Sequence, residues 1–320
     1  MGGGSYSYNS AVSRSVDKGY ATESVASSTG ADMSRYKRKM IHDVFTQRQV
    51  HQEMRSVGIQ VRESRDSEEH PNSLAIIIAL DVTGSMGQVP HQLLAEGFPK
   101  LMDKIIQAGV RDPQVMFLAI GDHNYDTAPL QVGQFESSDE LLEKWLTSMF
   151  LEGGGGGNAG ESYPLAWYFA ANHTSIDCWE KRKQKGILFT IGDEPPLMDF
   201  PREALQEIMG EGSQAGDEVA RKLLERAQET YEVFHIHIHE TPRGRQPDSM
   251  ERWGALLDKG SLLTSQHHDD VADTIANKIL EVQGKLDPLG PKQGRGVHKN
   301  ADGEIEEDKK KPAGNDVEMM

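Results

Sequence analysis

Three acidic residues, Asp81, Asp122 and Asp193, each come at or just after the end of a short apolar run in this sequence. The runs are LAIIIAL (74–80), VMFLAI (115–120) and ILFTI (187–191). Short, continuous apolar runs are typical of strands buried on both faces of a parallel sheet. Ligands of such sheets bind at the edge where the carboxyl ends of the strands meet. The three carboxylates are therefore predicted to collect at one edge of a sheet.

The residues after Asp81 add two hydroxyl groups to that edge. Thr83 and Ser85 stand at alternate positions, and Gly84 and Gly87 give the backbone freedom to turn. Carboxylate and hydroxyl oxygens are hard donors that suit Mg²⁺, Mn²⁺ or Ca²⁺. A helix that follows a strand and starts with a hydroxyl cap would also place Ser and Thr here. The segment by itself leaves both interpretations open.

The segment Asp81-Val-Thr-Gly-Ser-Met-Gly87 resembles the start of the metal ion-dependent adhesion site of von Willebrand factor A (vWA) domains. In that family a Thr on a second loop and an Asp on a third loop complete the pattern. Asp193, within Ile191-Gly-Asp-Glu-Pro-Pro196, is similar to the third element. The resemblance covers residues 73–284 and extends to stand-alone bacterial and phage vWA proteins.

The second loop, residues 153–162 (GGGGGNAGES), departs from the family pattern. When Gly160 and Glu161 are aligned with the family's Gly-Glu, the ligand Thr falls on Gly157, which has no hydroxyl. Asn158 and Glu161 are the two candidates to replace the missing ligand. Glu161 is the more strongly coordinating group of the two.

The resemblance implies a bound divalent cation, Mg²⁺ first, with Mn²⁺ or Ca²⁺ as alternatives. The metal ligands that it implies, with the two candidate replacements, are Asp81, Thr83, Ser85, Asp193, Asn158 and Glu161. Asp122 and Glu194 would lie in the surrounding shell or contact a partner. In the family, an Asp or Glu of a partner protein fills an open position on the ion. The resemblance thus implies a protein-binding module.

Catalytic residues are not assigned, because the sequence contains no recognisable nucleophile–base pair, and a non-enzymatic role is expected. Two alternatives stay open. One is a metal-dependent hydrolase that uses the same ion to activate water, with Glu161 or Glu194 as the base. The other is an adaptor or assembly subunit for an AAA+ ATPase or a phage structure.

Apolar runs and helical periodicities alternate between residues 73 and 284. The strands are predicted at 74–80, 115–120, 130–135, 187–191, 233–239 and 261–264. The helices are predicted at 94–106, 141–150, from 163, at 202–209, 217–230, 250–257 and 270–282. Pro99 within the first helical pattern predicts a kink or a helix start. This alternation predicts an α/β fold: a doubly wound, Rossmann-like, mostly parallel six-stranded sheet with helices on both faces. The resemblance implies the same (the vWA fold).

The two ends of the chain are predicted as extensions of this domain. In residues 1–72, the Ser- and Gly-rich stretch 1–33 has no stable period and is predicted to be disordered. A helix is predicted over 34–56, and 62–72 reads as a charged linker. Residues 285–320 are predicted to be a disordered polar tail.

The composition limits the partners. The formal net charge of −16 disfavours nonspecific binding to nucleic acid or to an anionic membrane. The single cysteine, Cys178, rules out a disulfide framework within the chain. The sequence shows neither a secretory signal nor an apolar span, so a cytoplasmic location is expected.

Histidines alternate along a predicted strand in His235-Ile-His-Ile-His239. Their side chains would share one face of the strand, where they could bind zinc or pack beneath helices. Packing is the expected role, because one strand leaves the remaining zinc ligands unspecified. His267 and His268, in a loop, could add to such a site.

Overall fold

The computed structural model describes residues 6–19, 47–154, 160–210 and 216–284. Several sequence predictions lie outside the described residues: the metal ligand Asn158, most of the helix predicted over 34–56, and the tail 285–320.

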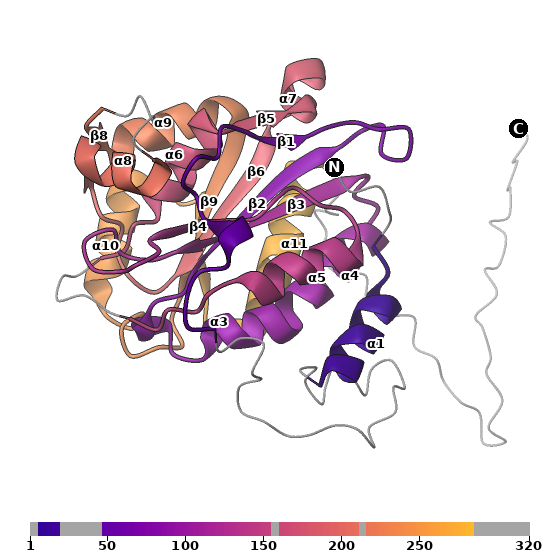
Figure 1. The fold of residues 1–320 in the computed structure, drawn as a ribbon, viewed down its shortest axis with the longest axis horizontal. Coiled ribbons are helices and arrows are strands. Elements are labelled where there is room, and N and C mark those ends of the chain that lie inside the picture. Colours follow the sequence, from indigo (N-terminus) through magenta and orange to yellow (C-terminus); the bar gives the residue numbers. More distant parts are fainter. Residues whose placement is uncertain (1–5, 20–46, 155–159, 211–215, 285–320) are drawn as a thin grey trace, which may run out of the picture.

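A six-stranded sheet forms the centre of the molecule, with the strand order β10-β9-β6-β2-β3-β4 (Figure 1). β4 is antiparallel to β3 and the other neighbours are parallel. This order is that of doubly wound sheets, and it confirms the predicted fold class. The strands are β2 (Leu74–Asp81), β3 (Pro113–Ile120), β4 (Leu130–Val132), β6 (Gly186–Gly192), β9 (Tyr231–Ile238) and β10 (Leu262–Ser265).

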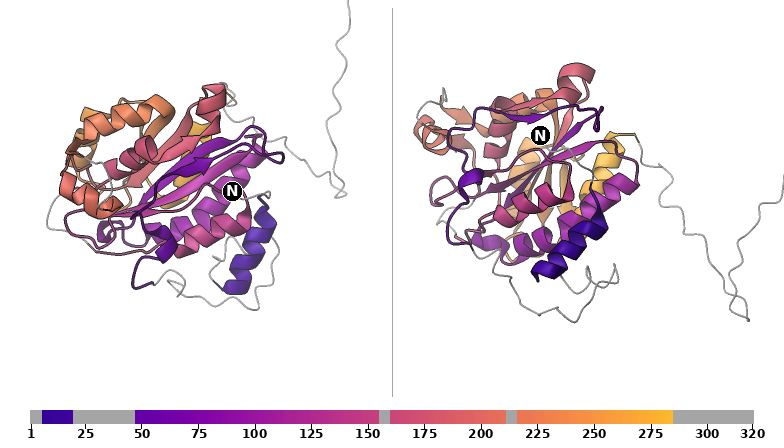
Figure 2. Two further views of the ribbon diagram at one scale, coloured as in Figure 1. Left: turned by 45° about the horizontal axis from the view of Figure 1, so that its top comes forward. Right: turned by 45° about the vertical axis from the view of Figure 1, so that its right-hand side comes forward.

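Helices cover both faces of the sheet, as the alternating pattern predicted (Figures 1 and 2). Side chains of β2 point alternately to two hydrophobic cores, Ile76 and Ile78 to one and Ala75 and Ile77 to the other. The first core is covered by α3 (Val89–Gln92), the π-helical turn Leu93–Gly97, α4 (Phe98–Gln107), α5 (Asp139–Ser148) and α11 (Val271–Val282). The second is covered by α6 (Pro164–Asn172), α7 (Asp177–Arg182), α8 (Arg202–Met209), α9 (Ala220–Thr230) and α10 (Pro247–Leu256).

Pro99 occupies the first turn of α4, directly after the π-helical turn. The chain is already helical before this proline, through α3 and the π-helical turn, so Pro99 does not start a separate helix. The π-helical turn interrupts the regular hydrogen-bond pattern just where the proline cannot take part in it.

The stretch 62–72 is part of the domain, and its prediction as a linker is wrong. β1 (Arg62–Ser64) pairs in parallel with β5 (Thr174–Ile176). Asp66 accepts hydrogen bonds from the backbone and hydroxyl of Ser73 and forms an ion pair with Arg182 at 2.7 Å. The charged residues that suggested a solvated linker are thus satisfied by partners in the domain.

Short elements complete the described chain. β7 (Asp199–Phe200) pairs with β8 (Glu218–Val219), and single 3₁₀ turns occur at Gln52–Met54, Gly84–Met86 and His268–Asp270. The first of these turns is the only helical element in residues 47–56, where the predicted helix was expected to end. No helix in the described part of the chain is both long and apolar enough to cross a bilayer.

Helix α1 (Tyr8–Lys18) lies in the stretch that was predicted to be disordered, so that prediction is wrong for these residues. Ser7 caps the helix by accepting a hydrogen bond from the Ser10 amide, and Gly19 ends it in the left-handed conformation. Val12 and Val16, one helical turn apart, are both buried. A two-valine stripe is too short for a periodicity search, which explains why the helix was missed.

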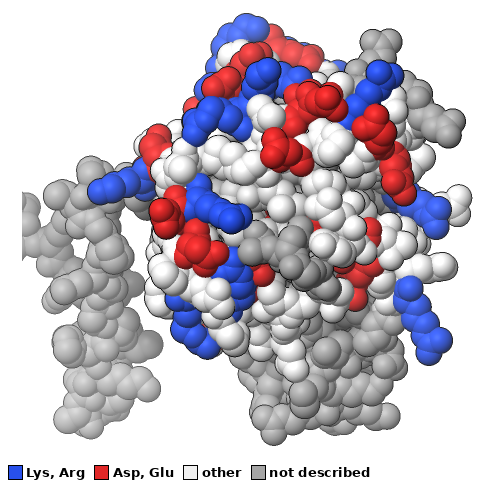
Figure 3. Space-filling model, turned by 90° about the vertical axis from the view of Figure 1, so that its left-hand side faces the viewer, with Lys and Arg blue, Asp and Glu red and all other residues white. Residues whose placement is uncertain are grey.

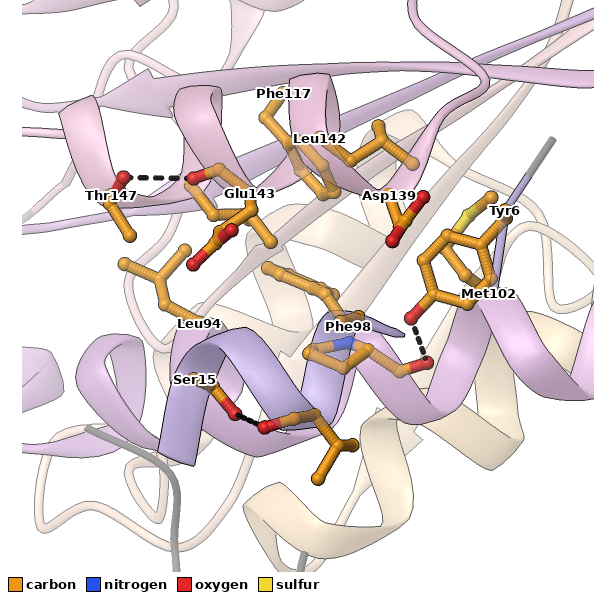
Figure 4. Close-up of a pocket in the computed structure, with 14 residues that line it drawn as sticks. Tyr6, Ser15, Leu94, Phe98, Met102, Phe117, Asp139, Leu142, Glu143 and Thr147 are labelled. Carbon is orange, nitrogen blue, oxygen red and sulfur yellow. Dashed lines mark hydrogen bonds between the residues drawn. The ribbon is translucent and has the colours of Figure 1, made fainter. Parts of the chain in front are cut away.

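Helix α1 packs across α4 and α5 (Figure 4). Its Arg14 forms ion pairs with Asp139 at 2.6 Å and Glu143 at 2.8 Å, both on α5. The Tyr6 hydroxyl, just before the helix, donates a hydrogen bond to the carbonyl of Pro99 at 2.9 Å. The helix therefore covers an apolar pocket of the domain.

Candidate metal centre

The order of the strands places Asp81 at the point where the chain changes direction across the sheet. From β2 the chain continues to β3 on one side and returns to β6 on the other. Asp81 is the last residue of β2, and Asp193 follows the last residue of β6. Ligands of doubly wound folds bind at such a switch point. In Figure 1 the carboxyl ends of these strands lie on the left, and Figure 3 faces that side.

The four main residues predicted for the site form two hydrogen-bonded pairs that lie side by side. The Thr83 hydroxyl and backbone amide donate to Asp81 Oδ1 at 2.6 Å and 2.9 Å. The Ser85 hydroxyl donates to Asp193 Oδ1 at 2.8 Å. The two hydroxyl oxygens are 3.3 Å apart. The fold thus brings together Asp81, Thr83, Ser85 and Asp193, although 108 positions separate Ser85 from Asp193.

Two residues that the sequence analysis missed hold the other oxygens of these carboxylates. The Tyr163 hydroxyl donates to Asp81 Oδ2 at 2.6 Å, and the Thr241 hydroxyl donates to Asp193 Oδ2 at 2.5 Å. Tyr163 is fully buried beneath the site. Thr241 belongs to no motif. It does follow the end of β9 by a few residues, and a search of every strand end for hydroxyls would have found it.

Burial raises the pKa of both carboxyl groups. The pKa of Asp81 rises to about 7, first because the group is buried and second because Asp193 is close. Burial also raises the pKa of Asp193, and the hydroxyls of Thr241 and Ser85 partly oppose that rise. Two negative charges are therefore unfavourable here without a cation.

Glu161 belongs to the same cluster. Burial, and then the charges of Asp81, Asp122 and other acids, raise its pKa to about 10. Its Oε2 is buried without a hydrogen-bond partner among the described residues. The Glu161 amide donates to the Pro195 carbonyl at 2.9 Å, which fixes this residue beside the loop of Asp193. Of the two candidates for the missing ligand, only Glu161 lies among the described residues, and the oxygens of Glu161, Asp81 and Asp193 do not all come within 4.8 Å of one another.

Asp122 and Glu194, predicted as outer residues, are both buried at this edge. Asp122 Oδ1 accepts two hydrogen bonds from Asn124, each of 2.9 Å, and its Oδ2 is buried without a partner among the described residues. Glu194 forms an ion pair with Arg243 at 2.6 Å, and Arg243 also pairs with Asp248. The ion pair engages one of the two carboxylates, Glu161 and Glu194, that the hydrolase alternative could use as a base.

The loop of Asp81 touches the start of the glycine run. The Gly84 amide donates a hydrogen bond to the carbonyl of Gly154, and the Gly153 amide donates to the Val82 carbonyl at 3.2 Å. A Cβ on Gly84 would lie 2.7 Å from the Gly154 oxygen and 2.9 Å from the Gly153 oxygen. Glycine is required at position 84 because the two backbones approach so closely.

The donor set fits a hard divalent cation. Carboxylates and hydroxyls provide the oxygen atoms that Mg²⁺ and Ca²⁺ prefer. One buried oxygen each of Glu161 and Asp122 lacks a hydrogen-bond donor among the described residues. A bound cation, or water held by it, would provide the partner that such buried oxygens normally have.

The three alternating histidines pack within the domain. The His235 ring stacks on Trp253, with ring centroids 3.6 Å apart, and one of its nitrogens is 2.9 Å from the Thr190 hydroxyl. His237 and His239 each have a ring nitrogen within hydrogen-bond distance of the Gly244 carbonyl oxygen. These contacts agree with the packing role that was expected.

No protein-family model matches the chain, and no curated protein matches it. Solved structures do match, at low sequence identity. The pilus adhesin SpaC from Lactobacillus rhamnosus GG has 10% identity and a TM-score of 0.46, over 68% of this chain and 31% of the adhesin. Proximal thread matrix protein 1 from the mussel byssus has 12% identity and a TM-score of 0.44, over 66% of this chain and 48% of that protein. An aerotolerance-related membrane protein from Bacteroides fragilis has 15% identity and a TM-score of 0.39, over 65% of this chain and 99% of that protein.

The chain spans less than half the length of the first two of these proteins. The fold itself is established by the sheet order and by the position of Asp81 at the switch point. Both agree with the vWA-type α/β architecture that the sequence resemblance implied.

Proposed function

We propose that this chain is a metal-dependent protein-binding module of the vWA type. A divalent cation, Mg²⁺ in the first place, is held by the oxygens of Asp81, Thr83, Ser85 and Asp193. A carboxylate of a partner protein completes the coordination of the ion, so the cation bridges the two proteins.

One observation carries this proposal: a buried group of carboxylates with too little positive charge around it. The pKa values of Asp81, Asp193 and Glu161 are all raised, and burial is the main cause in each case. Arg243 acts on Asp193, but it is engaged by two other acids. Keeping such a group anionic requires a cation, since uncompensated buried charges are costly.

Glu161 takes the place of the family's Thr ligand in this proposal. A carboxylate binds a hard cation more strongly than a hydroxyl does, and it adds one negative charge to the site. A site with an extra acid binds the cation more tightly, but it leaves less positive charge to attract the partner's carboxylate. The variant Glu161→Gln separates these two effects.

The exposure of the cluster indicates how a partner would approach. Asp81, Thr83 and Asp193 are buried, whereas Ser85 is partly exposed and Gly84 is exposed. Tyr125, in the loop after β3, is 59% exposed at the same edge. An exposed aromatic side chain beside a polar centre is typical of protein-binding surfaces.

Capture from an extract of the source organism tests the function. Wild-type chain and the Ser85→Ala variant are immobilised, and proteins retained with Mg²⁺ or with a chelator are identified by mass spectrometry. The proposal predicts a partner that is retained by wild type with Mg²⁺ and lost with the chelator or with Ser85→Ala. Replacing one Asp or Glu of that partner should also abolish its retention. Equal recovery of the same proteins with and without metal would refute the proposal.

A further inference from the structure

A second cluster of metal-ligating side chains lies at the same edge of the sheet. Glu240 follows β9, and His267 and His268 follow β10. β9 and β10 are parallel neighbours, so their carboxyl ends and the loops after them lie together. One ligand atom from each of these three side chains lies within 4.8 Å of the other two.

The distances within this cluster suit a small ion. His268 Nδ1 is 2.8 Å from Glu240 Oε2, and His267 Nε2 is 3.3 Å from Glu240 Oε1. The two imidazole rings lie 4.1 Å apart between centroids. Tetrahedral zinc with bonds of about 2.0–2.2 Å holds its donor atoms roughly 3.3–3.6 Å from one another. The three side chains could therefore bind an ion with only small movements.

A fourth residue, Asp269, contacts the far nitrogen of each imidazole. Its Oδ2 is 3.1 Å from His267 Nδ1, and its Oδ1 is 3.3 Å from His268 Nε2. Zinc-bound histidines commonly pair their other ring nitrogen with a carboxylate, which orients the ring and increases its basicity. Asp269 stands in that position for both rings at once.

We infer that Glu240, His267 and His268 form a second metal site, for zinc or a transition ion of similar softness, with Asp269 orienting the two imidazoles. Two nitrogens and a carboxylate favour such an ion, whereas the all-oxygen donors around Asp81 favour Mg²⁺. The two sites are therefore chemically distinct. The second one does not depend on the proposed function of the first.

The site is accessible from solvent and lies beside a residue of the first site. The side chain of His267 is 49% exposed and that of Glu240 is 28% exposed, so an ion can enter. Thr241, the next residue after Glu240, holds Asp193 through its hydroxyl. An ion bound here would tie together the loops that follow β9 and β10, and would stabilise the folded chain by mass action.

Zinc calorimetry on the full chain tests this inference. A large excess of Mg²⁺ is kept in the buffer so that hard-oxygen sites are saturated. Wild type should bind one Zn²⁺. Each of His267→Ala, His268→Ala and Glu240→Gln should weaken this binding by at least roughly 10–100-fold, which is the loss typical of removing a residue that only orients a metal ligand. His51→Ala is the matched control, since His51 is a comparably exposed histidine beside an acid, Glu53, outside the cluster. It should bind zinc as wild type does.

His267→Ala keeps the test decisive if the other variants fold poorly, because it leaves the contact between His268 and Glu240 in place. Circular dichroism and thermal unfolding without zinc verify the fold of each variant. Bound Co²⁺ should also give wild type the visible absorption of a tetrahedral site, which His267→Ala should lose. The inference is overturned if wild type binds no zinc in excess Mg²⁺, or if the three variants bind it as tightly as His51→Ala.

Discussion

Tyr163 holds the oxygen of Asp81 that Thr83 does not reach, through a hydrogen bond of 2.6 Å from its hydroxyl. In the variant Tyr163→Phe, ionised Asp81 loses this donor while the aromatic packing stays. Hydrogen bonds to charged groups contribute about 1.5–3 kcal/mol, so the free energy of unfolding above neutral pH should fall by about that amount. Mg²⁺ binding should weaken roughly 10–100-fold, as expected for a group that orients a ligand.

Tyr168→Phe, within the helix that Tyr163 precedes, is the control for this variant, because Tyr168 lies beside His173 rather than Asp81. Urea unfolding and Mg²⁺ calorimetry measure both quantities. Equal Mg²⁺ affinity of the two variants would show that the Tyr163 hydroxyl does not position Asp81 for an ion.

The raised pKa values of the cluster predict how stability depends on pH. The pKa of Asp81 rises from 3.8 to about 7, so the folded chain retains a proton that the unfolded chain releases. A raised pKa of an acid contributes stability that is complete below the unfolded value and is lost as pH rises through the folded value. The contribution of Asp81 to stability is therefore lost between pH 3.8 and about 7, and that of Glu161 between pH 4.5 and about 10.

Asp81→Asn removes the first of these titrations without changing the shape of the side chain much. Without divalent cations, wild type and variant should be similarly stable near pH 3.5, where Asp81 is mainly protonated in both the folded and the unfolded chain. The variant should be more stable near pH 8, because each unit by which the pKa is raised costs wild type about 1.4 kcal/mol. Added Mg²⁺ should reverse that order at the higher pH. Chemical unfolding at both pH values measures this. If, without metal, Asp81→Asn is less stable than wild type at the higher pH, then a buried negative charge on Asp81 does not destabilise the folded chain, contrary to this prediction.

At the scale of elements, the contact between the Asp81 loop and the glycine run depends on the absence of a side chain at Gly84. In Gly84→Ala the new Cβ would press on the backbone oxygens of Gly154 and Gly153, at 2.7 Å and 2.9 Å. One loop must move, so we expect loss of Mg²⁺ binding and a lower melting temperature. Calorimetry and thermal unfolding measure the two effects.

Gly254→Ala is the matched control for that variant. Gly254 lies within α10, and a Cβ there meets no atom within 4 Å. Alanine in a helix is favoured over glycine by roughly 0.5–1 kcal/mol, so this variant should be slightly more stable than wild type and bind Mg²⁺ normally. If both glycine variants behave alike, the close approach at Gly84 has no role in the site.

Helix α1 is joined to the domain through one narrow apolar face and the ion pairs of Arg14. Val12→Asp should release the helix, because a charge would be buried and about 1.5–3 kcal/mol of apolar burial lost. Hydrogen exchange should then show fast exchange confined to residues 8–18, with the sheet unaffected. Ser13→Asp places the same charge on an exposed neighbour and should leave exchange slow. Unchanged protection in Val12→Asp would show that this face does not hold the helix.

At the scale of the whole molecule, the sequence predicts those features that arise from long apolar runs. The run 74–80 predicts β2, and the six strands with their helices follow from similar patterns. The Asp81 loop is predicted from its motif, and Asp193 from its position after the end of a strand. The fold brings the hydroxyls of Thr83 and Ser85 together with these two carboxylates.

Features that rest on tertiary contacts were not predictable in this way. β1 is charged, and only its pairing with β5 makes it a strand. Helix α1 depends on a surface supplied by α4 and α5. Thr241 and Tyr163 reach the site from different elements, and no local spacing relates them to Asp81. The cluster of Glu240, His267 and His268 likewise arises from the pairing of β9 with β10.

The most direct test of the account is Mg²⁺ calorimetry on the full chain at a pH slightly above neutrality. Wild type should show one binding site, and both Asp81→Asn and Asp193→Asn should abolish it. Binding should be unchanged in Asp199→Asn, which alters an exposed acid on β7. Absence of any Mg²⁺ or Mn²⁺ binding by wild type, or binding that survives both Asp81→Asn and Asp193→Asn, would contradict the account.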